Sequence, residues 1–472
     1  MKDRSLPDYT KGPIVKALIG LSLPIVFANI LQTAYQLIDT FWVGRLGAVA
    51  VAAVSLSFPV IFLLISLGGG LAIAGTILVA QYKGQGNTEQ VDYVSAQTLF
   101  LMVAVSIVVS FFGYMISGPV MKLIGAGPDV LPAATSYLQI SFLGMVFMFG
   151  FFVYQSLMRG VGDVKTPLYI VFTTVLMNLM LDPLFILGWG PIPAYGVSGA
   201  ALATVGTQGV AAIVGMILLF SGRYGIQLKF SNLKFDLPLF KRMFRLGFPA
   251  SVSQSTRALG LGIMAVLVAT FGTMTVASYG IGMRIFSFII IPALGLSMAT
   301  STLVGQNLGA GRKDRAEAIA KKSLQIGFVV LTALGIILFL AARSITAAFI
   351  PDDPAVIEAG SYFVRIMALS FGFVGLQQTL NGTFMGAGET RISMVLSILA
   401  LWVFQFPLAF ILSKYTSLAE TGIWWSIPIS NVLAAIIAYM WFLKGSWKHK
   451  QLIGPAALHK EVMEEVVIDE GI

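Results

Sequence analysis

Two short segments decide the fold: VAQYKGQG at residues 79–86 and VGQNLGAG at residues 304–311. A shift of 225 residues, which brings position 79 onto 304, aligns them at Val79/Val304, Gln81/Gln306, Gly84/Gly309 and Gly86/Gly311. The same shift pairs Pro24 with Pro249 and Tyr137 with Tyr362. The chain is therefore a duplicated half, and whatever fold it adopts is built twice.

The composition places both halves in a membrane. Of 472 residues, 57% are hydrophobic and 11% are charged, and the mean hydropathy is +0.87. A soluble core cannot bury that much apolar surface. The chain has no cysteine, and its two histidines, His449 and His459, lie close to the C-terminus. Thiolate chemistry, cysteine metal sites and an imidazole-centred site inside the membrane are thereby excluded.

A membrane-crossing helix needs roughly 20 mainly apolar residues, and the sequence contains twelve such stretches. They cover residues 14–43, 47–80, 92–116, 131–158, 166–188, 196–220, 241–271, 273–307, 318–342, 357–384, 391–413 and 420–443. We therefore expect an all-α polytopic membrane protein with twelve transmembrane helices. Each copy of the repeat holds six spans, so both have the same orientation and form lobes related by a pseudo-twofold axis along the membrane normal.

The distribution of Lys and Arg predicts the topology. Of 30 basic residues, four lie in the odd-numbered loops: Arg45, Lys122, Arg343 and Lys414. Of the other 26, 23 lie in the even-numbered loops, the termini or the adjoining span ends, which the positive-inside rule places in the cytoplasm. The net charge of +9 is then a topology signal and not a nucleic-acid surface. We expect a multi-pass protein of the inner or plasma membrane with both termini cytoplasmic.

The resulting domain organisation has four parts. Residues 1–220 form an N-terminal lobe, 221–240 a cytoplasmic linker, 241–443 a C-terminal lobe and 444–472 a cytoplasmic tail. Two lobes around a cleft at the bilayer midplane are typical of secondary transporters, because lobes that rock expose one site to either side in turn. Nucleotide-driven pumping is disfavoured because the glycine-rich segments lack the GxxxxGKS/T pattern.

Two carboxylates lie inside the predicted spans away from the span ends and mark the candidate ion site: Asp39 in the first span and Asp182 in the fifth. A carboxylate at the bilayer centre is costly, so it normally faces a cavity or a partner. Asn178 lies four residues before Asp182 and shares its helix face. Together with Thr204 in the sixth span, these residues could offer oxygens to Na⁺ or hold a proton, so both ions stay open.

Further polar side chains suggest a substrate chamber and a hinge. Gln32, Tyr35, Gln36 and Asp39 follow helical spacing and form one stripe on the first span. Tyr154 and Gln155 in the fourth span could complete the chamber. Pro24 lies in the helix that carries Asp39, where it removes a backbone hydrogen bond and permits bending, so we expect a hinge linked to the ion state.

The C-terminal lobe has no acid at the duplicated positions. Met264 stands opposite Asp39, and Phe406 stands opposite Asp182. This lobe instead carries Arg257, Arg284 and Arg365 within its spans. Arg257 aligns with Gln32 on the expected cavity side. It could contact an anionic substrate, contact a lipid headgroup or balance an acid, and these alternatives stay open.

Several motifs together resemble the multidrug and toxic compound extrusion (MATE) family. They are LSLPIVFANILQTAYQLIDTFWVGRLG at 21–47, the paired VAQYKGQGN and VGQNLGAGR, RGVGDVKTP with MGAGETRIS, and MNLMLDPLFILGWG. The resemblance implies export of amphipathic, mostly cationic compounds in exchange for inward Na⁺ or H⁺, by alternating access of two lobes. It assigns the cation site to Asp39, Asn178, Asp182 and Thr204, with Tyr35 and Gln155 lining the chamber.

One departure from the family pattern narrows the resemblance. Some members carry further acids in spans seven and ten, where this chain reads SVSQSTRALG and LQQTLNGTF. The chain is therefore more similar to the prokaryotic DinF-like subgroup, whose ion site lies in the N-terminal lobe.

Three functions remain to be compared. The first is a secondary antiporter for organic cations or drugs, with no cofactor other than the coupling H⁺ or Na⁺ and with a possible Na⁺ held by Asp39, Asn178 and Asp182. The second is a flippase or exporter of a lipid-linked or anionic substrate, which the three arginines favour. The third is a membrane enzyme or a channel. The absence of catalytic His and Cys argues against an enzyme, and an acid site in only one of two duplicated halves argues against a simple pore. We expect a monomer whose partners are small amphipathic cations and membrane lipids, and no nucleic acid.

Overall fold

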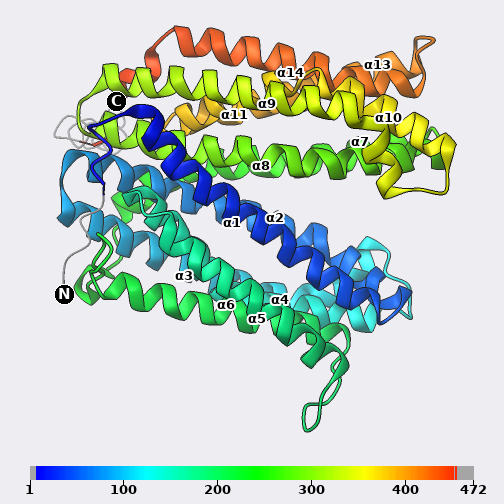
Figure 1. Ribbon diagram of the computed structural model, residues 1–472. Coiled ribbons are helices and arrows are strands. Elements are labelled where there is room, and N and C mark those ends of the chain that lie inside the picture. The colour runs from blue at the N-terminus through cyan, green and yellow to red at the C-terminus, as the bar shows by residue number, and fades with distance from the viewer. Residues whose placement is uncertain (1–6, 451, 454–472) are drawn as a thin grey trace, which may run out of the picture. The chain divides into compact units, whose positions relative to one another are not determined.

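A computed structural model describes residues 7–450, 452 and 453 (Figure 1). The first half contains α1 (Ile14–Gly44), α2 (Ala48–Gln85), α3 (Thr88–Ile124), α4 (Leu131–Val161), α5 (Lys165–Leu187) and α6 (Val197–Phe220). The second half contains α7 (Leu237–Ala269), α8 (Thr273–Gly309), α9 (Lys313–Phe349), α10 (Pro354–Ala368), α11 (Phe371–Gly386), α12 (Thr390–Ile398), α13 (Phe406–Lys414) and α14 (Glu420–Leu443). The acidic part of the predicted tail, from residue 454 onward, lies outside the described residues.

The predicted spans are confirmed with one correction. Eleven helices in the described residues are long and apolar enough to cross a membrane, and one bent pair makes up to twelve. The sequence predicted a single helix over 357–384, but α10 and α11 meet there at an angle of 50°. Ser370 lies at the break, where its hydroxyl donates to the carbonyl of Met367 and accepts from the Asn431 amide. The bend is therefore held by polar contacts.

A second irregularity interrupts the eleventh span. Residues Leu399–Gln405 form a π-helical stretch between α12 and α13. Pro407 follows directly, and a proline inside a helix removes one backbone donor and clashes with the carbonyl four residues earlier. The wider π turn relieves that clash while the span continues, as is common for single π turns within helices.

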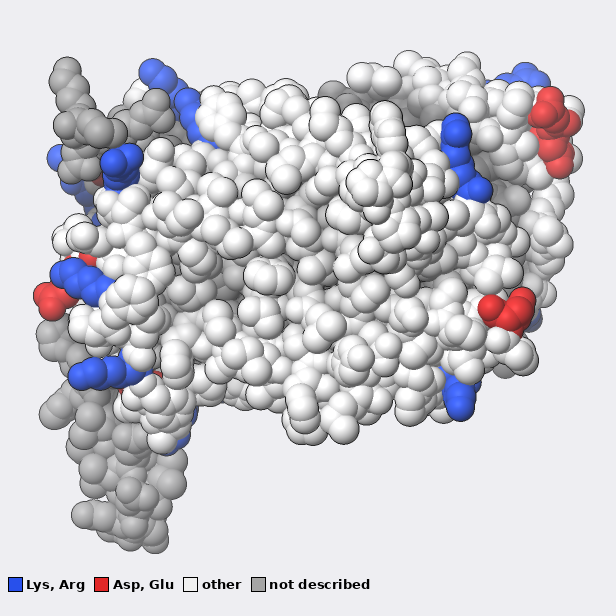
Figure 2. All heavy atoms as spheres, turned by 90° about the horizontal axis from the view of Figure 1, so that it is seen from below, with Lys and Arg blue, Asp and Glu red and all other residues white. Residues whose placement is uncertain are grey.

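The charged side chains agree with a membrane-embedded body. Figure 2 shows Lys, Arg, Asp and Glu gathered toward the two ends, with a broad uncharged band between them. Many side chains exposed on the helices are large and apolar, among them Phe111, Phe112, Ile217 and Leu340. In a soluble protein such a surface would aggregate. Here it is the surface expected to face lipid.

The helices pack into two compact units. The first comprises Phe27–Val79 and Asn87–Ser251 together with Pro7; the second comprises Asp8–Val26, Ala80–Gly86 and the described chain from Val252 onward. The division passes through α1 between Val26 and Phe27 and through α2 between Val79 and Ala80. Unit boundaries thus fall within continuous helices. The lobe boundaries at 220 and 241 stay a prediction.

The duplicated motif packs against itself inside the second unit. A Cβ atom added to Gly84 of α2 would lie 1.8 Å from the carbonyl oxygen of Gln306 on α8. A Cβ atom on Gly309 would lie 1.9 Å from the carbonyl oxygen of Gln81. Each glycine therefore meets the backbone of the other copy at the equivalent glutamine. This reciprocal contact requires Gly in both copies and explains why the two motifs share their spacing.

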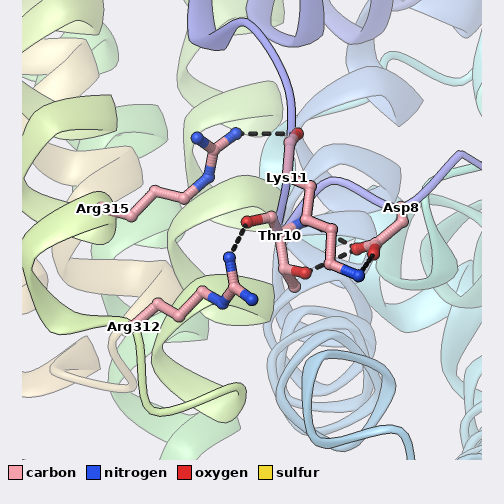
Figure 3. Close-up of polar contacts among 5 residues, drawn as sticks. All are labelled: Asp8, Thr10, Lys11, Arg312 and Arg315. Carbon is pink, nitrogen blue, oxygen red and sulfur yellow. Dashed lines mark hydrogen bonds and ion pairs between the residues drawn. The ribbon is translucent and has the colours of Figure 1, made fainter.

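The segment before α1 is fastened to the start of α9 (Figure 3). Arg312 donates to the carbonyl of Thr10 at 2.9 Å. Arg315 donates to the carbonyls of Lys11 and Gly12, each at 2.9 Å. The hydroxyl and backbone N–H of Thr10 donate to Asp8 and hold the pKa of that carboxyl below its usual range.

The chain after α14 returns to the same place. Lys448 pairs with Glu317 of α9 at 2.5 Å, and Lys450 pairs with Glu389 at 3.0 Å. The Trp447 side chain is fully buried, and its indole N–H donates to the carbonyl of Phe442. The described N- and C-terminal segments therefore both contact the beginning of α9, as an even number of spans requires.

Candidate functional site

Three helices of the first unit carry the residues predicted to bind an ion. Tyr35 and Asp39 lie four residues apart on α1, so they share one face. Asn178 and Asp182 have the same spacing on α5, and both side chains are fully buried. Thr204 lies on α6, which packs along α5. The short distance in sequence between α5 and α6 thus places the Thr204 helix beside Asp182.

Hydrogen bonds order this group of side chains. The amide nitrogen of Asn178 donates to Oδ1 of Asp182 at 2.9 Å. The Tyr35 hydroxyl shares a hydrogen bond of 2.7 Å with the Thr207 hydroxyl on α6. Tyr35 also lies within electrostatic range of Asp39 and Asp182, and the two carboxylates act on each other. The structure therefore brings α1, α5 and α6 together at one polar site.

Four buried oxygens of this site make no hydrogen bond of normal geometry among the described residues, although the Thr204 hydroxyl lies near the Tyr35 hydroxyl. They are Oδ1 of Asp39, Oδ1 of Asn178, Oδ2 of Asp182 and Oγ1 of Thr204. Buried polar atoms are nearly always paired, and each exception calls for an explanation. These four belong to the four residues predicted to hold the ion, and we call them the oxygen cluster.

The oxygen cluster has the donor chemistry of a hard cation or proton site. The described residues contain no group of three or more His, Cys, Asp or Glu side chains placed so that they could hold a metal ion. The cluster instead joins two carboxylates to one amide and one hydroxyl oxygen, and oxygen ligands suit hard cations. Pro183, inside α5, cannot donate to the carbonyl of Leu179, which leaves a further acceptor near Asn178. These residues fit Na⁺ as well as a proton.

Tyr137 of α4 belongs to the same site, although the sequence analysis did not assign it there. Its side chain is buried and lies within electrostatic range of Asp39, Tyr35 and Asp182. The only signal in the sequence was its pairing with Tyr362 in the repeat. A tyrosine hydroxyl is a hydrogen-bond donor that could serve a carboxylate of this site.

The predicted chamber residues do not all lie near the oxygen cluster. Gln32 and Gln36 are exposed on α1, while Tyr35 and Asp39 turn inward. Tyr154 is fully buried against Gly215 and lies within electrostatic range of Asp163 and Tyr224. Asp163 lies just before α5, whose first residue, Lys165, is about 26 Å of helix length from Asp182. The structure therefore places Tyr154 near the opposite end of the bundle.

Gln155 lies at the level of Tyr154. It is half-buried on α4, about 27 Å along that helix from Tyr137. Since Tyr137 contacts the site of Asp39, Gln155 is not brought to the oxygen cluster. A side chain at this depth could still meet a substrate elsewhere along its path.

Among the described residues, the second unit shows no equivalent acid site. Met264 is buried where the first half has Asp39, and Phe406 packs against an apolar core where the first half has Asp182. Arg257 of α7 donates to Oε1 of Gln378 on α11 at 3.2 Å. Arg284 is exposed on α8, and Arg365 lies in the last turn of α10. The two halves therefore share a fold but differ in charge.

Comparison with known proteins identifies the family. The MatE family model matches residues 24–184 and again 249–411, and the two matches begin at the pair Pro24 and Pro249. This chain belongs to the MATE family. The duplication and the fold of twelve spans in two six-helix lobes are thereby confirmed.

Individual MATE relatives match over nearly their whole length. The probable multidrug resistance protein YoeA of Bacillus subtilis is 30% identical, over 94% of this chain and 96% of its own. The FAD transporter of Shewanella oneidensis is 28% identical, over 93% of this chain and 96% of its own. A multidrug resistance MATE transporter solved in an outward-facing conformation is 25% identical, with a TM-score of 0.88 over 96% of this chain and all of its own. The chain is thus a multi-pass membrane transporter of this family, whose relatives include multidrug efflux proteins.

Proposed function

We propose that this MATE protein is a secondary antiporter that exports amphipathic organic cations in exchange for inward H⁺ or Na⁺. The observation that carries the proposal is the oxygen cluster: four buried oxygens on three helices of one unit, which make no hydrogen bond of normal geometry in the described residues. Such atoms in a membrane span call for a ligand. A cation that enters the cluster supplies one, and its release leaves two carboxylates repelling each other.

Coupling then follows from the difference between the loaded and empty clusters. When the cation binds, it attracts both the Asp39 carboxylate on α1 and the Asp182 carboxylate on α5. This shared attraction holds α1 against α5. When the ion leaves, that attraction is lost and α1 is free to shift. A ligand moves a conformational equilibrium only through its different affinity for the two states. In this proposal the ion supplies that difference, and the lobes expose the substrate path alternately to each side, with both termini in the cytoplasm.

The test of this function is uptake of a fluorescent organic cation into proteoliposomes under an imposed pH gradient or an imposed Na⁺ gradient. We expect uptake to follow one of the two gradients. Uptake that ignores both gradients would contradict antiport. Because the cluster fits either ion, the gradient that drives uptake also names the coupling ion.

Pro24 is the proposed hinge of α1. It lies inside the helix, where it cannot donate to the carbonyl of Gly20, and the boundary between the two units falls two residues later. Pro24→Ala restores that hydrogen bond and should stiffen α1. We expect the initial rate of uptake to fall several-fold while equilibrium dye binding stays unchanged. A variant with the normal rate would exclude bending at Pro24.

A second candidate is export of an anionic or lipid-linked substrate. It is supported by Arg257, which lies in the middle of α7, and by the relative named FAD transporter. The dye uptake assay separates the two candidates, because an exporter confined to anionic substrates would move no purely cationic dye under either gradient.

A further inference from the structure

Arg257 is a cation at membrane depth with little to balance it. It lies on α7, which runs from Leu237 to Ala269. At the helical rise of about 1.5 Å per residue, it lies about 30 Å from the start of α7 and about 18 Å from its end. Both distances place it well inside the hydrocarbon layer, which is about 30 Å thick. Neither helix end is close enough to bring the guanidinium to water.

Within the described residues, the Arg257 side chain makes one hydrogen bond, to Gln378, and no ion pair. The ion pairs described elsewhere in this unit, such as Lys448–Glu317 and Lys450–Glu389, lie at helix ends. A guanidinium has five N–H donors, so one neutral acceptor leaves most of them for a ligand. The α7 helix itself contains no Asp or Glu that could pair with Arg257.

The other arginines in these spans have simpler explanations. Arg284 is exposed on α8. Arg365 lies in the last turn of α10, where a cation interacts favourably with the helix C-terminus. Arg257 is half-buried and lies far from both ends of its helix. Within the described part of the chain no carboxylate pairs with it, so its position calls for a negative charge from a ligand.

Gln378 completes a recognition pair. Its side chain is buried on α11, and it orients Arg257 by accepting one of its N–H groups. The amide nitrogen of Gln378 is itself a donor. A carboxylate or phosphate at this position would receive hydrogen bonds from both side chains, and planar guanidinium groups bind such anions in a two-pronged geometry.

We propose that Arg257 and Gln378 form a subsite for the anionic group, a carboxylate or a phosphate, of an amphipathic ligand. The inference rests on the proposed transport function and deepens it, because it extends the substrates to compounds that carry an acid group, zwitterions included. The oxygen cluster and this subsite lie in different units. Coupling ion and substrate anion are therefore recognised by separate parts of the chain.

The test uses two dyes that differ in one group. Rhodamine B carries a free carboxylate, and its ethyl ester is a cation without one. Binding is measured by fluorescence anisotropy with the full chain in detergent, and uptake is measured in proteoliposomes. We expect Arg257→Gln to weaken binding of rhodamine B at least about tenfold, as for loss of one partner of a buried charged pair, and to leave the ester unchanged. Gln378→Leu should produce a smaller loss of the same kind.

Matched variants keep the result interpretable. Arg284→Gln removes the same charge from an exposed site and should alter neither dye. Arg257→Lys keeps the charge without the planar geometry and should restore part of the rhodamine B affinity. Equal weakening of both dyes by Arg257→Gln, or no change in either, would overturn the proposal.

A lipid phosphate is the other source of the anion, and a second arm identifies it. Wild type and Arg257→Gln are compared by native mass spectrometry for retained phosphatidylglycerol. Loss of retained lipid in the variant, without a change in dye preference, assigns the subsite to lipid and overturns its role in substrate recognition. Failure of the antiport proposal would look different. Wild-type protein would then take up dye without dependence on either gradient, while anisotropy would still report whether Arg257→Gln changes the preference between the two dyes.

Discussion

Asp39→Asn and Asp182→Asn are each expected to reduce gradient-driven uptake of an organic cation to the leak rate of protein-free liposomes. Asn has nearly the shape of Asp and keeps one oxygen, but it can neither carry the compensating negative charge nor bind a proton. The oxygen cluster would then lose half of its charge with either substitution. Uptake by the reconstituted variants, normalised to inserted protein, measures the effect.

The fold should survive these two substitutions. Asp39 and Asp182 act on each other as like charges, so removing one charge relieves repulsion, and the melting temperature should stay equal or rise. Asp352→Asn, on an exposed loop, is the matched control and should transport normally. Wild-type uptake by either cluster variant would mean that the carboxylates are structural.

Gly84→Ala and Gly309→Ala are expected to be the most destabilising small substitutions in the chain. The added methyl group would lie 1.8 Å or 1.9 Å from a backbone carbonyl oxygen, and a backbone atom cannot move aside as a flexible side chain can. Overpacking of this kind costs typically about 1–3 kcal/mol and occasionally more. The measurement is the melting temperature and the folded yield in detergent.

Other glycines on the same helices supply the controls for this prediction. A Cβ on Gly69 of α2 would make ordinary contacts at 3.8 Å, and one on Gly280 of α8 would meet nothing within 4 Å. Gly69→Ala and Gly280→Ala should therefore fold with unchanged or slightly higher stability, since Ala favours helix. If all four variants melted alike, the reciprocal contact would not hold α2 against α8.

The spans and the repeat could be predicted from the sequence because their signals are long. A run of about twenty apolar residues has few possible structures other than a membrane-spanning helix. An internal repeat of this length does not arise by chance. The break between α10 and α11 could not be seen, because Ser370 and the glycines near it are compatible with a straight membrane helix. The bend depends on Asn431, which lies 61 residues away.

The part of the candidate site that could be predicted is the part with acidic residues, because acids are rare inside membrane spans. Asp39 and Asp182 stood out as acids inside spans, and helical spacing added Tyr35 and Asn178. Tyr137 was missed because a single tyrosine in an apolar helix has no distinguishing pattern. Tyr154 and Gln155 were expected beside the cluster because polar side chains were grouped by lobe, and the sequence does not show their depth along α4.

The two halves differ in their buried charges, and this difference indicates which half binds the coupling ion. The oxygen cluster lies in the unit that contains α5 and α6, and the equivalent positions of the other unit carry Met264 and Phe406. A mechanism in which both halves bind the coupling ion would require two carboxylate sites. The charges of the described residues favour one ion site in the first half and a separate, basic subsite in the second.

If the oxygen cluster holds the ion that is exchanged for substrate, substrate binding should release that ion. Purified protein in weakly buffered detergent solution is titrated with a cationic dye, while a pH indicator and a Na⁺-selective electrode record what is released. Wild type should release H⁺ or Na⁺ in proportion to bound dye, and the Asp39→Asn, Asp182→Asn double variant should release neither while remaining folded. Equal release by the double variant would place the coupling ion elsewhere and contradict the account.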